Sequence, residues 1–140
     1  QNARKLVFCG TLAARAKIEL EAGRLRLVAR GAPKFVPRVK QVTFSGPHAL
    51  ADGHEVLYVT EAAVFRLTRA GIELVEIAPG LSVEDDVLPQ MGFPPVVGPA
   101  VQTMRAELFQ PQLLPPQLFP RFFSDLALPA PKSHNEGAIR

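Results

Sequence analysis

Short apolar runs with the spacing of β-strands dominate the first 80 residues of this chain. Residues 5–11 (KLVFCGT) form a continuous apolar run that closes on a glycine and a threonine. Such a run is typical of a strand buried on both faces, as in a parallel sheet. Four further strands are predicted, at residues 39–44, 55–60, 63–68 and 72–77. The last two are separated by a short loop that contains Gly71, which predicts a hairpin.

Residues 17–27 predict a second hairpin, because aliphatic and charged residues alternate on both sides of Ala22 and Gly23. A two-residue loop at Ala22 and Gly23 sets the register of this hairpin. That register pairs Leu20 with Leu25, Ile18 with Leu27, Glu21 with Arg24 and Glu19 with Arg26. The two aliphatic pairs then share one face and the two oppositely charged pairs share the other, so both sets stabilise the same register.

Two short helical segments are also predicted. Residues 47–52 suit a single helical turn. Ser82 has the character of a helix N-cap, and the acidic residues 84–86 favour the positive end of the helix that follows. Pro89 removes a backbone hydrogen bond, so the helix is expected to kink or end there. Gly92 suits the C-terminal cap.

The composition changes in the last third of the chain, where ten of the fourteen prolines lie in residues 89–131. We expect residues 1–109 to be one domain part, with a short packed element at residues 104–109, and residues 110–140 to be a proline-rich arm or tail. Residues 111–120 (PQLLPPQLFP) cannot form a regular helix or a central strand. They predict either an extended arm on a neighbouring surface or a tail beyond the last packed element.

The net charge of +3 conceals a strong asymmetry along the chain. Residues 1–46 contain ten Lys and Arg against two acids, whereas residues 47–98 contain two Arg against eight acids. A basic segment can attract nucleic acid, an acidic partner or a phosphorylated ligand such as CoA. Because the basic residues alternate with apolar ones, as strands require, we expect a solvated face that balances the acidic segment.

Length and composition suit a globular protein. The chain has 140 residues, 47% of them hydrophobic, which is enough for one domain or a large part of one. No apolar run approaches the roughly 18 residues of a membrane span, so no membrane partner is expected. The single cysteine fits a cytoplasmic protein. The first residues lack an initiator Met and a signal-peptide pattern, so we expect the chain to start inside a longer gene product.

Few residues are candidates for chemistry. The histidines His48, His54 and His134 lack the spacing of a zinc site, so no metal is expected. The sequence names no base for Cys9, so a buried structural cysteine is expected. The acidic residues 84–86 are explained by the helix start that they occupy. The pattern therefore predicts a scaffold rather than a catalytic centre.

Several segments resemble one enzyme family in the same order along the chain. Residues 1–11 (QNARKLVFCGT) are similar to a late strand in the second half of the family I CoA-transferases, the propionate or acyl-CoA:acetate/3-ketoacid type. The ordered resemblance covers about residues 1–109. The other similar segments are residues 34–36 (KFV), 42–46 (VTFSG), 58–61 (YVTE), 63–65 (AVF), 76–80 (EIAPG), 86–88 (DVL) and 90–91 (QM).

The resemblance implies an α/β fold, namely the C-terminal part of an open, mostly parallel sheet with β-hairpins and few short helices. It also implies a reaction in which a glutamate attacks an acyl-CoA, an anhydride forms, and returning CoA leaves a glutamyl-CoA thioester that activates a carboxylate. The substrates are then an acyl-CoA and a carboxylate, with no permanent cofactor.

The nucleophilic Glu and the glycine-rich oxyanion segment of the family precede the stretch that resembles residues 1–11. No Glu of this chain matches the nucleophile motif, so the resemblance implies no catalytic residue here. It implies instead that an upstream transferase portion is the partner, in a homo- or hetero-oligomer, and that this chain alone is inactive.

Cys9, Gly10 and Thr11 end the first predicted strand. Ligands of open α/β sheets bind outside the carboxyl ends of parallel strands, so we expect these three residues to line the pocket. An alternative hypothesis is a non-catalytic, β-rich interaction module that binds through the basic first third of the chain. Binding of RNA or DNA would depend on charge alone and is not expected.

Overall fold

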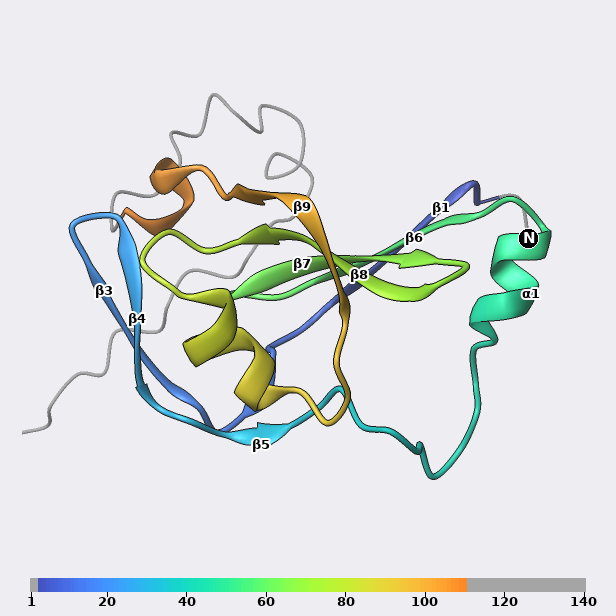
Figure 1. Cartoon of the computed structure of the whole chain (residues 1–140), viewed down its shortest axis with the longest axis horizontal. Helices are drawn as coiled ribbons and strands as arrows, with labels where there is room; N and C mark the ends of the chain where they lie inside the picture. Colours follow the sequence, from blue (N-terminus) through green and yellow to red (C-terminus); the bar gives the residue numbers. More distant parts are fainter. Residues whose placement is uncertain (1–2, 111–140) are drawn as a thin grey trace, which may run out of the picture.

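A five-stranded sheet forms the centre of the computed structural model, which describes residues 3–110 (Figure 1). Its order is β1-β6-β7-β8-β9, and the outer pairs β1–β6 and β8–β9 are parallel. The inner pairs β6–β7 and β7–β8 are antiparallel, because short turns can join only antiparallel neighbours. The strands are β1 (Lys5–Cys9), β6 (Glu55–Val59), β7 (Ala63–Thr68), β8 (Gly71–Ile77) and β9 (Val96–Thr103).

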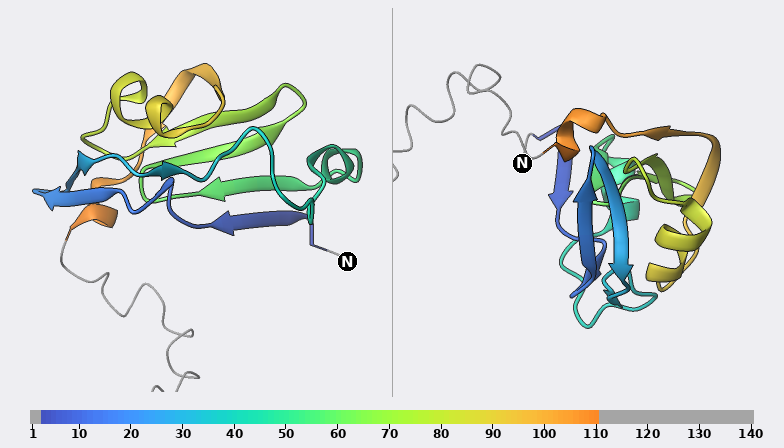
Figure 2. Two further views of the ribbon diagram at one scale, coloured as in Figure 1. Left: turned by 90° about the horizontal axis from the view of Figure 1, so that it is seen from below. Right: turned by 90° about the vertical axis from the view of Figure 1, so that its left-hand side faces the viewer.

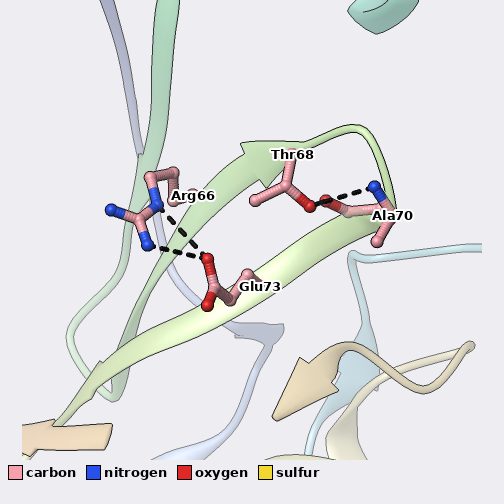
Figure 3. A network of polar contacts seen from close by, with 5 residues as sticks. Arg66, Thr68, Ala70 and Glu73 are labelled. Atoms are coloured by element: carbon pink, nitrogen blue, oxygen red, sulfur yellow. Dashed lines mark hydrogen bonds and ion pairs between the residues drawn. The ribbon is translucent and has the colours of Figure 1, made fainter. Parts of the chain in front are cut away.

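The α/β class with β-hairpins and few short helices is confirmed, although the described sheet is mixed rather than mostly parallel. The hairpin β7–β8 is stabilised at its turn, where Thr68 Oγ1 donates to the Gly71 carbonyl at 2.9 Å and accepts from the Ala70 amide at 3.2 Å. Figure 3 shows this turn and the cross-strand ion pair of Arg66 with Glu73, at 2.8 Å.

The second hairpin consists of β3 (Lys17–Glu21) and β4 (Arg24–Ala29) and has the predicted register from Ile18 opposite Leu27 to Glu21 opposite Arg24. Both loop residues have positive φ, 49° at Ala22 and 75° at Gly23, as a two-residue hairpin turn requires. A small ladder of β2 (Ala13–Ala14) with β5 (Ala32–Pro33) lies at the base of this hairpin.

The helical elements are short. The predicted turn is α1 (Gly46–Ala51), capped by Ser45. The predicted N-cap Ser82 begins a π-helical turn, η1 (Val83–Val87), which continues into the 3₁₀ turn η2 (Leu88–Gln90) at Pro89. The expected C-cap role of Gly92 is wrong: its amide donates to the Phe35 carbonyl at 2.7 Å, and a Cβ there would lie 2.8 Å from that oxygen. Glycine is therefore required at position 92 because the Phe35 backbone lies so close, and not because the backbone of Gly92 is left-handed.

Two apolar clusters hold these elements together. Phe65 and Leu74 of the sheet pack with Val87 of η1 and with Met91, which follows η2. The η1–η2 segment lies along one side of the sheet (Figure 2). A smaller cluster contains Leu25, Ala78, Met104 and Phe109. It joins the β3–β4 hairpin to η3 (Ala106–Phe109), the short element predicted at residues 104–109.

Two other expectations about strands are wrong, and one strand was missed. Residues 39–44 form no strand. The strand β1 is not buried on both faces: it lies at an edge of the sheet, and Val7 is 54% exposed. The strand β9 was not expected, because Gly98 and Pro99 interrupt its pattern; they fall where its pairing with β8 shifts register.

Residues 111–140, which contain nearly all of the expected proline-rich arm, lie outside the described residues, so the boundary at residue 110 stays a prediction. Within residues 3–110, no helix is long and apolar enough to cross a bilayer.

Candidate functional site

A hollow of about 240 Å³ opens at the carboxyl ends of the parallel strands β1 and β6. The structure places Cys9, Gly10 and Thr11 on its wall, next to Val59 and Thr60 at the end of β6. The Gly10 amide donates to the Val59 carbonyl at 3.0 Å, so the parallel pairing continues to the rim. The position is the one at which open α/β sheets bind ligands; the binding role of these three residues stays a prediction.

Among the described residues that line this hollow, Lys34 is the only one with a positively charged side chain. Its ammonium group donates to Thr11 Oγ1 at 2.6 Å, which holds the charge over the end of β1. No functional role was expected for Lys34, although it begins one of the segments (KFV) that resemble the CoA-transferases. The segment after β5 brings it to the site across a long sequence separation, which a strand pattern does not reveal.

Aromatic rings form the apolar side of the hollow. Phe8 stacks on Tyr58 with ring centres 5.3 Å apart, and Phe35 meets Tyr58 edge to face at 6.0 Å. Burial raises the pKa of the Tyr58 hydroxyl, because the phenolate is disfavoured away from water. Tyr58 is therefore a neutral wall residue at physiological pH.

The turn between β6 and β7 holds the residues after β1 in place. Glu61 lies in this turn rather than on a strand, and both of its carboxylate oxygens accept from the Leu12 amide, at 3.0 and 3.3 Å. Thr60 shapes the same turn, since its hydroxyl donates to the Ala63 carbonyl at 2.7 Å. Glu61 thus has a structural role at the hollow, where it fixes the chain that follows Thr11.

Cys9 is exposed, so the expected buried structural cysteine is wrong. The reason is the position of β1 at the sheet edge, where no described strand covers the outer side. Of the described residues, no hydrogen-bond partner is present for its thiol, and no histidine lines the hollow.

The acidic residues 84–86 act as a helix start, as predicted. The Ser82 hydroxyl accepts from the Asp85 amide at 3.2 Å, and the Asp86 carboxylate accepts in return from the Ser82 amide at 2.8 Å. His48 and His54 both face Asp52, at 3.4 and 3.9 Å, and neither of them lines the hollow. In residues 3–110, no group of three or more His, Cys, Asp or Glu side chains is placed to hold a metal ion.

No family model matches the chain, but known proteins are similar to it in sequence and in fold. Acetate CoA-transferase YdiF of Escherichia coli strain K12 is 43% identical over 110 residues, which are 77% of this chain and 21% of that protein. Caffeate CoA-transferase of Acetobacterium woodii is 39% identical over 110 residues, which are 78% of this chain and 21% of that protein.

Solved structures agree with these relatives. A crystal structure of the acyl-CoA transferase YdiF from E. coli O157:H7, in a thioester complex with CoA, matches with a TM-score of 0.73 at 43% identity. The match covers 77% of this chain and 22% of that one. The crystal structure of the apoenzyme matches with the same TM-score.

The chain therefore carries a CoA-transferase segment, as its resemblance to that family implied. The segment corresponds to the C-terminal portion of these relatives. The chain spans only about a fifth of the length of the curated relatives that it matches.

Proposed function

We propose that the chain is the C-terminal segment of an acyl-CoA:carboxylate CoA-transferase of the acetate/3-oxoacid kind, working through a glutamyl-CoA thioester on a Glu outside this chain. The observation that carries the proposal is the 43% identity to YdiF, of which one crystal structure is a thioester complex with CoA. Without the nucleophile, the 140 residues alone are inactive.

The segment contributes one wall of the active site. Cys9, Gly10 and Thr11 line the pocket from the end of β1, and Lys34 adds a positive charge beside Thr11. A cation at this position suits the negatively charged groups of the substrates, which are the phosphates of CoA and the acceptor carboxylate. The aromatic wall of Phe8, Tyr58 and Phe35 suits the apolar parts of an acyl-CoA.

The remaining wall comes from the partner. An upstream CoA-transferase portion carries the catalytic Glu and packs against this segment in a cytoplasmic homo- or hetero-oligomer. CoA acts as a substrate in the form of its thioester, and no permanent cofactor or metal takes part.

A chimera tests this proposal. The 140 residues replace the homologous C-terminal stretch of E. coli YdiF, and transfer of CoA from acetyl-CoA to a carboxylate is measured. Activity that is lost when borohydride is added together with acetyl-CoA, but not with borohydride alone, supports a thioester intermediate. A folded chimera without activity contradicts the proposal and favours the non-catalytic interaction module. Turnover by the 140 residues alone contradicts the external nucleophile.

A further inference from the structure

The rings beside the hollow belong to a row of packed aromatic side chains. Phe8 lies against Tyr58 with the two ring planes 15° from parallel, and Phe35 stands at 72° to Tyr58. Phe35 in turn packs on the fully buried Phe65 and on Phe93, with ring centres 5.0 and 6.5 Å apart. Because Phe8, Tyr58 and Phe35 line the hollow and further rings support Phe35 from behind, the aromatic wall is formed before any ligand arrives.

The volume of the hollow limits what this wall can receive. It is about 240 Å³, whereas an engineered apolar cavity of about 150 Å³ in another protein binds benzene. Sites for drug-sized ligands begin near about 300 Å³. One aromatic ring with a short polar chain therefore suits the hollow, whereas an acetyl group would leave most of the aromatic wall uncovered.

Charge is confined to one place on the rim of the hollow. Lys34 is the only Lys, Arg, His, Asp or Glu among the described residues that line it, and Thr11 Oγ1 holds its ammonium group at 2.6 Å. Tyr58 adds no charge, because burial raises the pKa of its hydroxyl and keeps it protonated. A single cation matches a single carboxylate, whereas the several phosphate groups of CoA call for more than one.

We propose that this hollow binds the acid that the transferase exchanges, and that this acid is a small aromatic carboxylate. Its ring lies on Phe8, Phe35 and Tyr58, and its carboxylate pairs with Lys34. Aromatic rings gain from offset or edge-to-face packing beyond the burial of their surface, which a saturated ring of similar size does not. The role of the acid as a transferase substrate rests on the proposed function, whereas all the residues that bind it belong to this chain.

Titration of the isolated 140-residue chain, followed by amide NMR spectra, tests the site without any catalysis. The probe is phenylpropionate, and we expect saturable shifts of the amides of Cys9, Gly10, Thr11 and Phe35. Cyclohexylpropionate differs only in its saturated ring and should bind about threefold to tenfold more weakly. Acetate, which lacks the ring, should bind more weakly still. Absence of saturable shifts in the folded chain, or equal affinity for the saturated acid, overturns the proposal.

Two further ligands test the carboxylate. Phenylpropionamide has the same ring without the charge, so we expect Lys34→Met to lower the affinity for phenylpropionate about tenfold and to leave the affinity for the amide unchanged. Free CoA should not shift the four amides at the concentration of phenylpropionate that saturates the site. Equal losses for the acid and the amide, or saturable shifts of the same amides by CoA, contradict the proposal.

The variants Phe35→Leu and Phe93→Leu separate the wall from the packing behind it. Both remove a ring from the same row, but only Phe35 lines the hollow. We expect Phe35→Leu to weaken phenylpropionate binding about threefold to tenfold, and Phe93→Leu to leave it within about twofold of the wild type. Equal losses in the two folded variants mean that the row only supports the fold, which overturns the proposal. If Phe35→Leu does not fold, Phe8→Leu replaces it, because Phe8 is 42% exposed.

The YdiF chimera separates this site from the proposed function. We expect the chimera to accept phenylpropionate, and Phe35→Leu to lower kcat/KM for phenylpropionate several-fold relative to that for acetate. An inactive chimera, beside an isolated chain that binds phenylpropionate, contradicts the proposed function and leaves the ligand site supported. An active chimera, beside a folded chain that does not bind phenylpropionate, overturns the aromatic acid site and leaves the proposed function supported.

Discussion

The ammonium group of Lys34 donates a hydrogen bond to the hydroxyl of Thr11 at 2.6 Å, across 23 positions of sequence. This contact joins the end of β1 to the segment after β5 and places a cation on the rim of the hollow. It is the feature of the candidate site that is best suited to a negatively charged substrate.

Replacing that cation should weaken substrate binding more than it weakens folding. In the YdiF chimera, we expect Lys34→Met to raise the KM for acetyl-CoA about tenfold, because a charge-assisted hydrogen bond contributes about 1.5–3 kcal/mol. Lys17→Met is the matched control, since Lys17 is exposed on β3 and lines none of the described pockets. Steady-state kinetics check this expectation, and equal KM values for the two variants would contradict a substrate-binding role for Lys34.

Glu61 should stabilise the folded protein through the hydrogen bond that its carboxylate accepts from the Leu12 amide. Glu61→Ala leaves this amide without its partner next to the buried Leu12 side chain, so we expect the free energy of unfolding to fall by about 1–3 kcal/mol. Glu61→Gln retains an acceptor oxygen and should cost less. Urea unfolding of the three proteins gives the comparison; equal losses in the two variants would show that the charge, not the hydrogen bond, stabilises the turn.

Gly80 should be the least replaceable of the positive-φ glycines. Its φ is +97°, and an added Cβ would lie 2.7 Å from the Leu25 carbonyl oxygen and 3.1 Å from the Arg24 Cβ. Gly53 has a φ of +73° but open space around the same position. We expect Gly53→Ala to cost about 1 kcal/mol from backbone strain alone, and Gly80→Ala about 2–4 kcal/mol because a steric clash is added. Thermal unfolding measures both, and similar costs would contradict the close packing of Gly80 on β4.

Tyr58 should make the protein less stable at alkaline pH. Because burial raises its pKa in the folded state, the unfolded chain loses the phenolic proton first as the pH rises. Its contribution is therefore complete below the pKa of the unfolded chain, about 10, and is lost as the pH rises through the higher folded value. We expect the difference in unfolding free energy between the wild type and Tyr58→Phe to be constant from pH 7 to 9 and to shift toward the variant above pH 10. A difference that stays constant to pH 11 would contradict this cause.

The hairpins and caps were predictable because their signals are local. Alternation around Ala22 and Gly23 determined the register of β3–β4 for the four pairs from Ile18–Leu27 to Glu21–Arg24, beyond which a register shift pairs Lys17 with Ala29. Ser82 was recognisable as a cap from its own side chain and the acids that follow it. Each of these features depends on residues only a few positions apart, so no knowledge of the rest of the fold was needed.

The errors arose where a distant neighbour decides the outcome. The apolar run of β1 predicted burial, but burial depends on what lies beside the strand, and β1 is an edge of the described sheet. Residues 39–44 have a strand pattern but pair with no strand within residues 3–110, although Phe44 packs edge-on against Phe8 with ring centres 5.1 Å apart. In contrast, β9 pairs with β8 despite its proline, because the register shift leaves room for it.

By itself, the sequence determined the hairpins and helix starts of this protein, the class of enzyme segment that it resembles and the end of β1 as a place to look for a site. Only the tertiary structure decided that Lys34 and Tyr58 line that place, that Glu61 holds the Leu12 amide beyond it, and that Cys9 is exposed. The physical reason is the range of the interactions: turns and caps are set by neighbouring residues, whereas a pocket and a sheet edge exist only after distant strands have paired.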